Sequence, residues 1–184
     1  MASMNTTRRF TEFDRPIEDM EWLRMATLLD TEGSIQIKKL LAAVKYGCRQ
    51  ANHQLQVTVT NTDPRIPIWC KSVFGGSISF RKPPKSHHRR IYRWSAGTAR
   101  GQAVLIGCLP YFLIKRNQAE VAIAYRDTVA QKKYFRAGLS EDVFAERERL
   151  RIELQDLKRE EFETTDEHKD IVEQLDPRSQ SFKK

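Results

Sequence analysis

The spacing of hydrophobic residues changes repeatedly along the chain, and these changes predict the order of its elements. Between residues 17 and 29, apolar residues recur every three or four positions, which predicts a helix with a wide apolar stripe. Alternation of polar and apolar residues then predicts strands at 34–38, 54–60, 77–81 and 91–95. Helical spacing returns at about 64–74, 98–109, 113–131 and 140–162.

Residues with strong end preferences mark where these helices should begin and stop. We expect Asp14 to cap the first helix, with Pro16 in its first turn, and Gly33 to end it. Residues 61–64 should cap the second helix, and the pair Gly75-Gly76 should end it. The order predicts an α+β fold, αββαββα, followed by helices.

The 184 residues fit one main domain. We expect it to span residues 14–135, after an N-terminal extension at 1–13. Residues 136–184 should form a C-terminal helical extension with a polar tail.

Alternation in the four strands sorts their side chains onto two faces. One face is apolar and should pack under the helices: Ile35, Ile37, Leu55, Val57, Val59, Ile78, Phe80, Tyr92 and Trp94. The other is polar and basic and contains no acid: Gln36, Lys38, Gln54, Gln56, Thr58, Thr60, Ser77, Ser79, Arg81 and Arg93. A solvated face usually mixes Glu and Lys, whereas these side chains are the kind that contact base edges in a major groove.

Charge is distributed unevenly along the sequence. The net charge is +8, but residues 33–118 hold fifteen Lys/Arg and a single acid, Asp63, which gives that block a charge of +14. A generally basic surface would spread its charge more evenly, so the block predicts a face that binds a polyanion, most simply nucleic acid. The loop 81–93, with six basic residues and no acid, predicts phosphate contacts through residues such as Lys82, Lys85 and Arg89.

Other compositional features exclude several classes of protein. No apolar run is long enough to span a membrane, and the first residues lack the apolar stretch of a signal peptide. Cys48, Cys70 and Cys108 lie far apart and are odd in number, which argues against a structural zinc site and a disulfide framework. We therefore expect an intracellular protein, cytoplasmic or organellar, that is not secreted and has no membrane partner.

A nine-residue segment carries a family resemblance. Residues 25–33 are Met-Ala-Thr-Leu-Leu-Asp-Thr-Glu-Gly, which resembles the motif of the LAGLIDADG homing endonucleases, with Glu32 replacing the second Asp and Thr27 the usual Gly. Further similar segments lie at 61–64, 74–78, 92–94 and 110–119. The resemblance covers about residues 17–135 and implies that family's αββαββα core with a four-stranded antiparallel DNA-binding sheet and C-terminal helices.

The chain carries one copy of the motif, and single-motif members of the family act as homodimers. The resemblance therefore implies that two motif helices pack together at a twofold axis, through Met25, Ala26, Thr27 and Leu29. Thr27 occupies the tightest point of that contact, which favours a looser or repacked interface. Twofold symmetry would make the double-stranded DNA target palindromic or nearly so.

The resemblance also implies a divalent metal site. Glu32 aligns with the family's metal-binding acid, and the backbone carbonyl of Thr31 would complete the site. Mg²⁺ is a hard ion that suits one or two carboxylates plus phosphate oxygens and water, and Mn²⁺ would substitute for it. The earlier acid of the motif, Asp30, is expected to be structural instead, satisfying backbone groups near the helix end.

Other side chains are assigned catalytic or DNA-binding roles by the same resemblance. Lys115 aligns with a lysine that polarises the attacking water or stabilises phosphate charge, and Asn61 with a polar residue that holds the water pocket. Arg65, four residues after Asn61, is expected to contact the scissile phosphate. The expected DNA contacts are Ser34, Gln36, Lys38, Gln54, Gln56, Thr58, Thr60, Arg65, Ser77, Ser79, Arg81, Lys82, Lys85, Arg89 and Arg93.

Together these features predict a homodimeric, Mg²⁺-dependent, site-specific endonuclease that cuts a site of ~20 bp, leaves 3′ overhangs and serves intron homing. One alternative is a DNA- or RNA-binding protein on the same scaffold that has lost cleavage, such as an intron maturase or a transcriptional regulator. Another is a basic structural or ribosome-associated protein, which the acid-free alternating strands disfavour.

Overall fold

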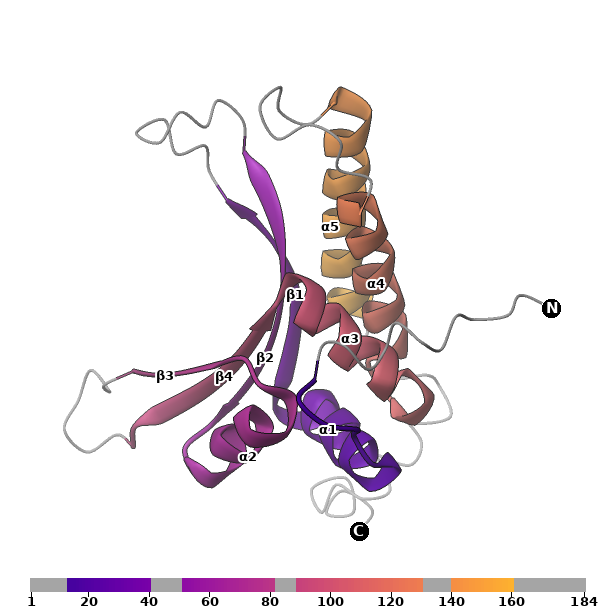
Figure 1. Cartoon of the computed structure of the whole chain (residues 1–184). Coiled ribbons are helices and arrows are strands. Elements are labelled where there is room, and N and C mark those ends of the chain that lie inside the picture. Colours follow the sequence, from indigo (N-terminus) through magenta and orange to yellow (C-terminus); the bar gives the residue numbers. More distant parts are fainter. Residues whose placement is uncertain (1–12, 41–50, 82–88, 131–139, 161–184) are drawn as a thin grey trace, which may run out of the picture.

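A computed structural model describes residues 13–40, 51–81, 89–130 and 140–160 (Figure 1). Its strands are β1 (Gly33–Leu40), β2 (Asn52–Asn61), β3 (Ser77–Arg81) and β4 (Ile91–Gly97). Its helices are α1 (Asp19–Glu32), α2 (Arg65–Phe74), α3 (Thr98–Cys108), the 3-10 turn η3 (Leu109–Tyr111), α4 (Arg116–Ala130) and α5 (Glu141–Glu160). The predicted α+β class and αββαββα order are confirmed.

The four strands form one antiparallel sheet in the order β1-β2-β4-β3, so β1 and β3 are its edges. The helices lie on one side of this curved sheet and leave its other side open (Figure 1). Ile35, Leu55, Val57 and Trp94 point to the helix side and are fully buried. The alternation therefore predicted which strand face is the core.

Three predicted core residues lie outside the buried core, and two of them, Ile78 and Tyr92, are half-buried. The third, Phe80, is 64% exposed. β3 is an edge strand with only β4 beside it, so a side chain near its end has strand neighbours on one side alone. The turn before β3 was predicted correctly: Gly75 and Gly76 both have positive φ angles, which glycine adopts without a steric cost.

The first helix begins later than expected. α1 begins at Asp19, and its N-cap is Glu18, not Asp14. The side chains of Glu18 and Glu21 accept each other's backbone N–H groups in a capping box, which satisfies two donors at the helix start. Arg15 forms an ion pair with Glu21 and so holds the preceding residues against the first turn.

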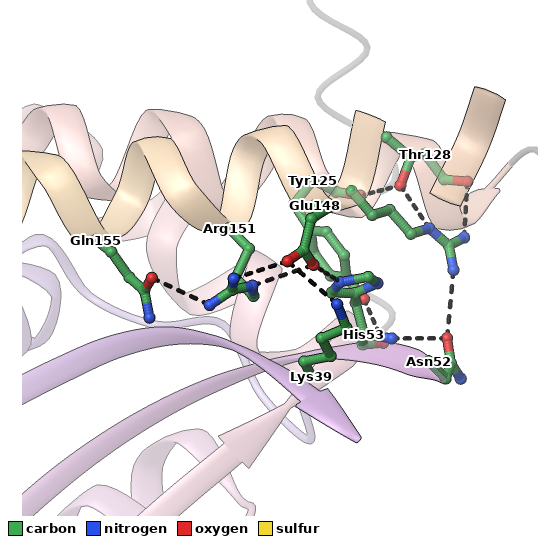
Figure 2. Close-up of polar contacts among 9 residues, drawn as sticks. Lys39, Asn52, His53, Tyr125, Thr128, Glu148, Arg151 and Gln155 are labelled. Atoms are coloured by element: carbon green, nitrogen blue, oxygen red, sulfur yellow. Dashed lines mark hydrogen bonds and ion pairs between the residues drawn. The ribbon is translucent and has the colours of Figure 1, made fainter. Parts of the chain in front are cut away.

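The last helix is part of the same packed unit as the rest of the described chain. α5 places Leu150 and Leu154 in the hydrophobic core. Its first turns are also joined to the sheet by polar side chains (Figure 2): Glu148 meets the buried imidazole of His53 at 2.7 Å. None of the helices in the described ranges is long and apolar enough to cross a membrane.

Candidate nucleic-acid interface and metal site

The motif helix passes directly into the first strand. Gly33 follows the last residue of α1 and donates its N–H to the carbonyl of Leu29. A Cβ at position 33 would lie 2.5 Å from the Cα of Leu29, so only glycine fits this close approach. The junction leaves Thr31 and Glu32 exposed, immediately before the first residue of the open strand face, Ser34.

Asp30 holds a distant segment against the end of α1. Its two carboxylate oxygens accept the backbone N–H groups of Leu113 and Lys115, each at 2.9 Å. These amides precede α4 and would otherwise need other acceptors. The structural role expected for Asp30 is therefore confirmed.

The ammonium group of Lys115 lies at the same junction. It donates to the carbonyl oxygens of Leu29, Asp30 and Gly33 at 2.7, 2.8 and 3.0 Å. The last carbonyls of a helix lack N–H donors within it and carry the negative end of its dipole, so a cation is stabilised there. In the single chain Lys115 thus fastens the junction, and its expected part in catalysis stays a prediction.

The donor set at the junction suits a hard divalent cation only in part. The hydroxyl of Thr31 donates to the carbonyl of Thr27 at 2.9 Å, which leaves its own backbone carbonyl as the ligand it could offer. Within the described ranges no group of three His, Cys, Asp or Glu residues could hold a metal. One carboxylate, Glu32, with a carbonyl nonetheless fits Mg²⁺, which takes its other ligands from water and phosphate.

Asn61 and Arg65 lie at the turn between β2 and α2. Asn61 Oδ1 accepts the N–H of Asp63 at 2.9 Å, and Asp63 Oδ1 accepts the N–H of Arg65 at 2.9 Å. The Arg65 guanidinium also binds this carboxylate, and that hydrogen bond lowers the pKa of Asp63 to about 2. Arg65 therefore lies off the sheet, with an exposed side chain already paired to an acid.

The strand register brings most of the predicted contact residues onto the open face. Ser34, Thr58, Ser95 and Ser77 are consecutive partners across the four strands. Neighbouring rows on the same face contain Gln36 with Gln56, Lys38 with Gln54, Thr60 with Arg93 and Ser79, and Arg81. No Asp or Glu lies in any of the four described strands, so this face presents donors and positive charge together.

Some of the predicted contacts differ from expectation. Thr58 is only 6% exposed and its hydroxyl lies 3.5 Å from the carbonyl of Ser34, so it offers little surface and the expectation of a DNA contact is not supported. Arg89 is exposed just before β4, whereas Lys82 and Lys85 lie outside the described residues. Ser95 was missed, although continuing the alternation of β4 would have placed it on this face.

The predicted dimer contact is wrong for three of its four residues. Met25, Ala26 and Leu29 are fully buried in the core of their own chain, so they present no surface to a second copy. Thr27, the fourth, is exposed. The wide apolar stripe of α1 also reaches the outer surface of the helix. There Met20 is 64% and Leu23 41% exposed, and both lie on the same side of the helix as Thr27.

No protein-family model and no curated protein sequence matches the chain. Among solved structures, the homing endonuclease I-CvuI, in complex with its target in the presence of calcium, has a TM-score of 0.61 and 17% identity over 80% of this chain and 85% of its own. The archaeal intron-encoded homing endonuclease I-Vdi141I, complexed with DNA, has a TM-score of 0.60 and 13% identity, covering 77% and 86%.

A third structure matches over a smaller share of its length. I-SmaMI, bound to uncleaved DNA in the presence of calcium ions, has a TM-score of 0.57 and 17% identity over 77% of this chain but 46% of its own. The LAGLIDADG homing endonuclease I-GzeII, in complex with its DNA target, is matched in the same way, over 44% of its chain. The resemblance first seen in the motif is thereby confirmed in the fold.

Proposed function

We propose that this chain, which has the fold of the LAGLIDADG homing endonucleases, is a site-specific double-strand DNA endonuclease that acts as a homodimer. The observation that carries the proposal is the junction of α1 and β1. There an exposed carboxylate, Glu32, stands two residues before Ser34, at the end of an open sheet face that holds no acid. A carboxylate in that position can bind a metal ion next to a DNA phosphate while the adjoining sheet face contacts the bases.

Two observations support the proposed homodimer: the match to only part of I-SmaMI and the exposed side of α1. The chain corresponds to less than half of I-SmaMI and carries one motif, so a second copy would supply the other half. The hydroxyls of Thr27 and Thr31 donate to carbonyls one turn earlier, at 2.9 Å each. Packing this side of α1 against its symmetry mate would therefore bury few unsatisfied polar groups. Leu23 and Met20 would add apolar area to the contact.

Two copies related by a twofold axis would present two polar sheet faces to one duplex. Gln, Arg, Lys and Ser side chains in paired strands can contact base edges in the major groove, and two such sheets would cover ~20 bp of a palindromic or nearly palindromic site. Arg89 and the neighbouring basic residues would bind phosphates, which makes affinity strongly salt-dependent.

In the proposed mechanism, Glu32 and the Thr31 carbonyl of each copy would hold Mg²⁺, with Mn²⁺ as a substitute. When bound, the metal supplies charge stabilisation at the scissile phosphate and the departing 3′ oxygen. Lys115 positions the site, because its bonds to Leu29, Asp30 and Gly33 fix the backbone on both sides of the two proposed ligands. Cleavage of both strands would leave 3′ overhangs, as expected for intron homing.

A second candidate function is DNA or RNA binding without cleavage, as in an intron maturase or a transcriptional regulator. The observation that favours it is the engagement of Lys115: three N–H groups of an ammonium can be accounted for by the three carbonyls it contacts. A lysine held in this way has no proton left to polarise water until it is rearranged. The acid-free face serves this function equally well.

Cleavage of a randomised palindromic DNA library in Mg²⁺ separates these functions. The intact chain should enrich cut sites, and Glu32→Gln should bind the same sites and leave them uncut. Glu120→Gln is the matched control, because Glu120 is an exposed acid on α4 paired with Arg116 at 3.2 Å; it should cut like the intact chain. Selective binding without cutting by all three proteins would favour the second function, and equal cutting by Glu32→Gln would refute the role of Glu32.

A further inference from the structure

A groove lies between the free edge of the sheet and the last helix. It encloses about 620 Å³ and is lined on one side by β1, from Gln36 to Leu40, and on the other by residues of the second half of α5. The helix side consists of Arg151, Leu154, Gln155, Lys158 and Arg159. It is separate from the α1 junction and is not part of the proposed catalytic site.

The groove is basic. Its lining holds five Lys or Arg residues and no Asp or Glu. Two acids at its margin compensate part of this charge: Glu148 pairs with Lys39 at 3.2 Å and with Arg151 at 2.7 Å, and Asp156 pairs with Arg159 at 3.3 Å. The lining of this concave site is therefore positively charged, and a concave shape concentrates the field of like charges.

The wall formed by α5 is held firmly at its first half (Figure 2). Arg147, itself 1% exposed, donates to the hydroxyl of Thr128 at 3.0 Å and to its carbonyl at 3.1 Å. Glu148 binds the buried ring of His53 at 2.7 Å, while Tyr125 donates its hydroxyl to the carbonyl of the same histidine. These contacts hold α5 against α4 and β2, and the ion pair of Glu148 with Lys39 at 3.2 Å joins α5 to β1, so both walls of the groove are held in place.

The opposite wall is a sheet edge. Among the described strands β1 pairs with β2 alone, so the backbone N–H and C=O groups along its outer side could pair with an added strand. Residues Gln36 to Leu40 offer about 17 Å of this edge at the ordinary rise per residue. An extended peptide laid there would gain backbone hydrogen bonds from β1 and charge contacts from α5.

The sequence that directly follows α5 has the matching charge. Residues 161–176 contain seven Asp or Glu and one Lys, a net charge of −6, in a chain that is +8 overall. They begin one residue after Glu160, where α5 ends at the groove's helix wall. Sixteen residues can extend to about 50 Å, which is enough to turn back and run along the edge. A segment tethered this close to the groove would meet it at an effective concentration in roughly the millimolar range.

We propose that the groove between β1 and α5 binds the acidic segment 161–176 of the same chain as an added edge strand. Bound there, the segment covers Lys38, a residue of the proposed DNA-binding face, and places negative charge beside it. Non-specific nucleic acid must then displace the segment to reach this end of the face. The segment thus competes, within the same chain, with other polyanions.

Amide hydrogen exchange of the full-length chain without DNA tests the proposal independently of any cleavage. A variant with Glu163→Gln, Asp166→Asn, Glu167→Gln and Asp170→Asn should exchange the edge amides of residues 36–40 about threefold to tenfold faster than the unmodified chain. The difference should shrink in 0.5 M salt, because screening weakens the charge contacts.

Two single variants on α5 provide a matched comparison. Arg159 and Arg149 are both exposed and both paired with an acid three residues earlier, at 3.3 and 2.8 Å, but only Arg159 lines the groove. Arg159→Gln should speed exchange at 36–40 and Arg149→Gln should not. Unchanged exchange in the four-residue variant would overturn the proposal. Protection of residues 36–40 that appears only when duplex DNA is added, equally in both chains, would also overturn it and assign the groove to nucleic acid.

Discussion

Asp30 and Lys115 are joined in both directions across the end of the motif helix. The carboxylate of Asp30 accepts the backbone N–H of Lys115 at 2.9 Å, and the ammonium of Lys115 donates to the backbone carbonyl of Asp30 at 2.8 Å. Eighty-five positions separate the two residues in sequence. This reciprocal pair ties the segment before α4 to the α1–β1 junction, where the proposed metal ligands Thr31 and Glu32 lie.

The two acids of the motif should respond differently to neutralisation. Asp30→Asn replaces one acceptor oxygen by an N–H donor facing a backbone amide, so we expect it to lower the free energy of unfolding by about 1–3 kcal/mol. Glu32→Gln alters an exposed side chain and should change that free energy by less than about 0.5 kcal/mol. Urea unfolding followed by circular dichroism measures both. Equal losses would contradict the assignment of Asp30 as the structural acid.

Removing the charge of Lys115 should loosen the junction. Lys115→Met keeps most of the side-chain length but loses three hydrogen bonds to carbonyls at the end of α1, and we expect about 2–3 kcal/mol less stability in chemical denaturation. Lys71→Met is the control, because Lys71 is an exposed lysine in the last turn of α2. A loss no larger than that of the control would show that these bonds contribute little.

Lowering the pH should weaken the contacts by which Glu148 holds α5 to the rest of the chain. Hydrogen bonding to Arg151, followed by His53 and Lys39, lowers the pKa of Glu148 from 4.5 to about 2. Because the folded pKa is the lower one, this stabilisation is complete above about pH 4.5 and is lost as the pH falls toward 2. Glu148 is 23% exposed, so after allowance for solvent screening we expect about 1–2 kcal/mol.

The unfolding free energy measured between pH 2.5 and pH 5 checks this expectation. Glu148→Gln should flatten its dependence on pH in that window. Glu153→Gln, which removes a more exposed acid of the same helix paired with Arg149 at 2.7 Å, should keep the slope. Parallel pH profiles for the unmodified chain and Glu148→Gln would contradict the role of Glu148.

The exposed side of α1 should control the proposed dimer. Leu23→Glu places a negative charge next to Thr27 on that side. In a twofold contact the charges of the two copies repel each other, so the dissociation constant of the dimer should rise by about tenfold or more. Ile68→Glu is the control, because Ile68 is a comparably exposed apolar residue on α2, 55% against 41%. Sedimentation equilibrium of the two variants gives the comparison; an identical shift in both would move the interface away from α1.

Much of the fold was determined by the sequence alone. Period-two alternation fixed the face of each strand, because a strand's successive side chains point to opposite sides whatever surrounds them. The Gly75-Gly76 turn was equally predictable, since its positive φ angles favour glycine locally. The motif similarly indicated the α1–β1 junction, because the tight approach of residue 33 to Leu29 lies within one turn of chain.

Tertiary structure decided what depends on partners distant in sequence. Periodicity gave α1 a wide apolar stripe, but only packing against the sheet showed that Met25, Ala26 and Leu29 face inward and Leu23 and Thr27 outward. The bonds from Lys115 to α1, and those from α5 to His53, join residues more than eighty positions apart. No local pattern contains such pairs, because a polar side chain can satisfy its hydrogen bonds with water until folding brings its protein partner within reach.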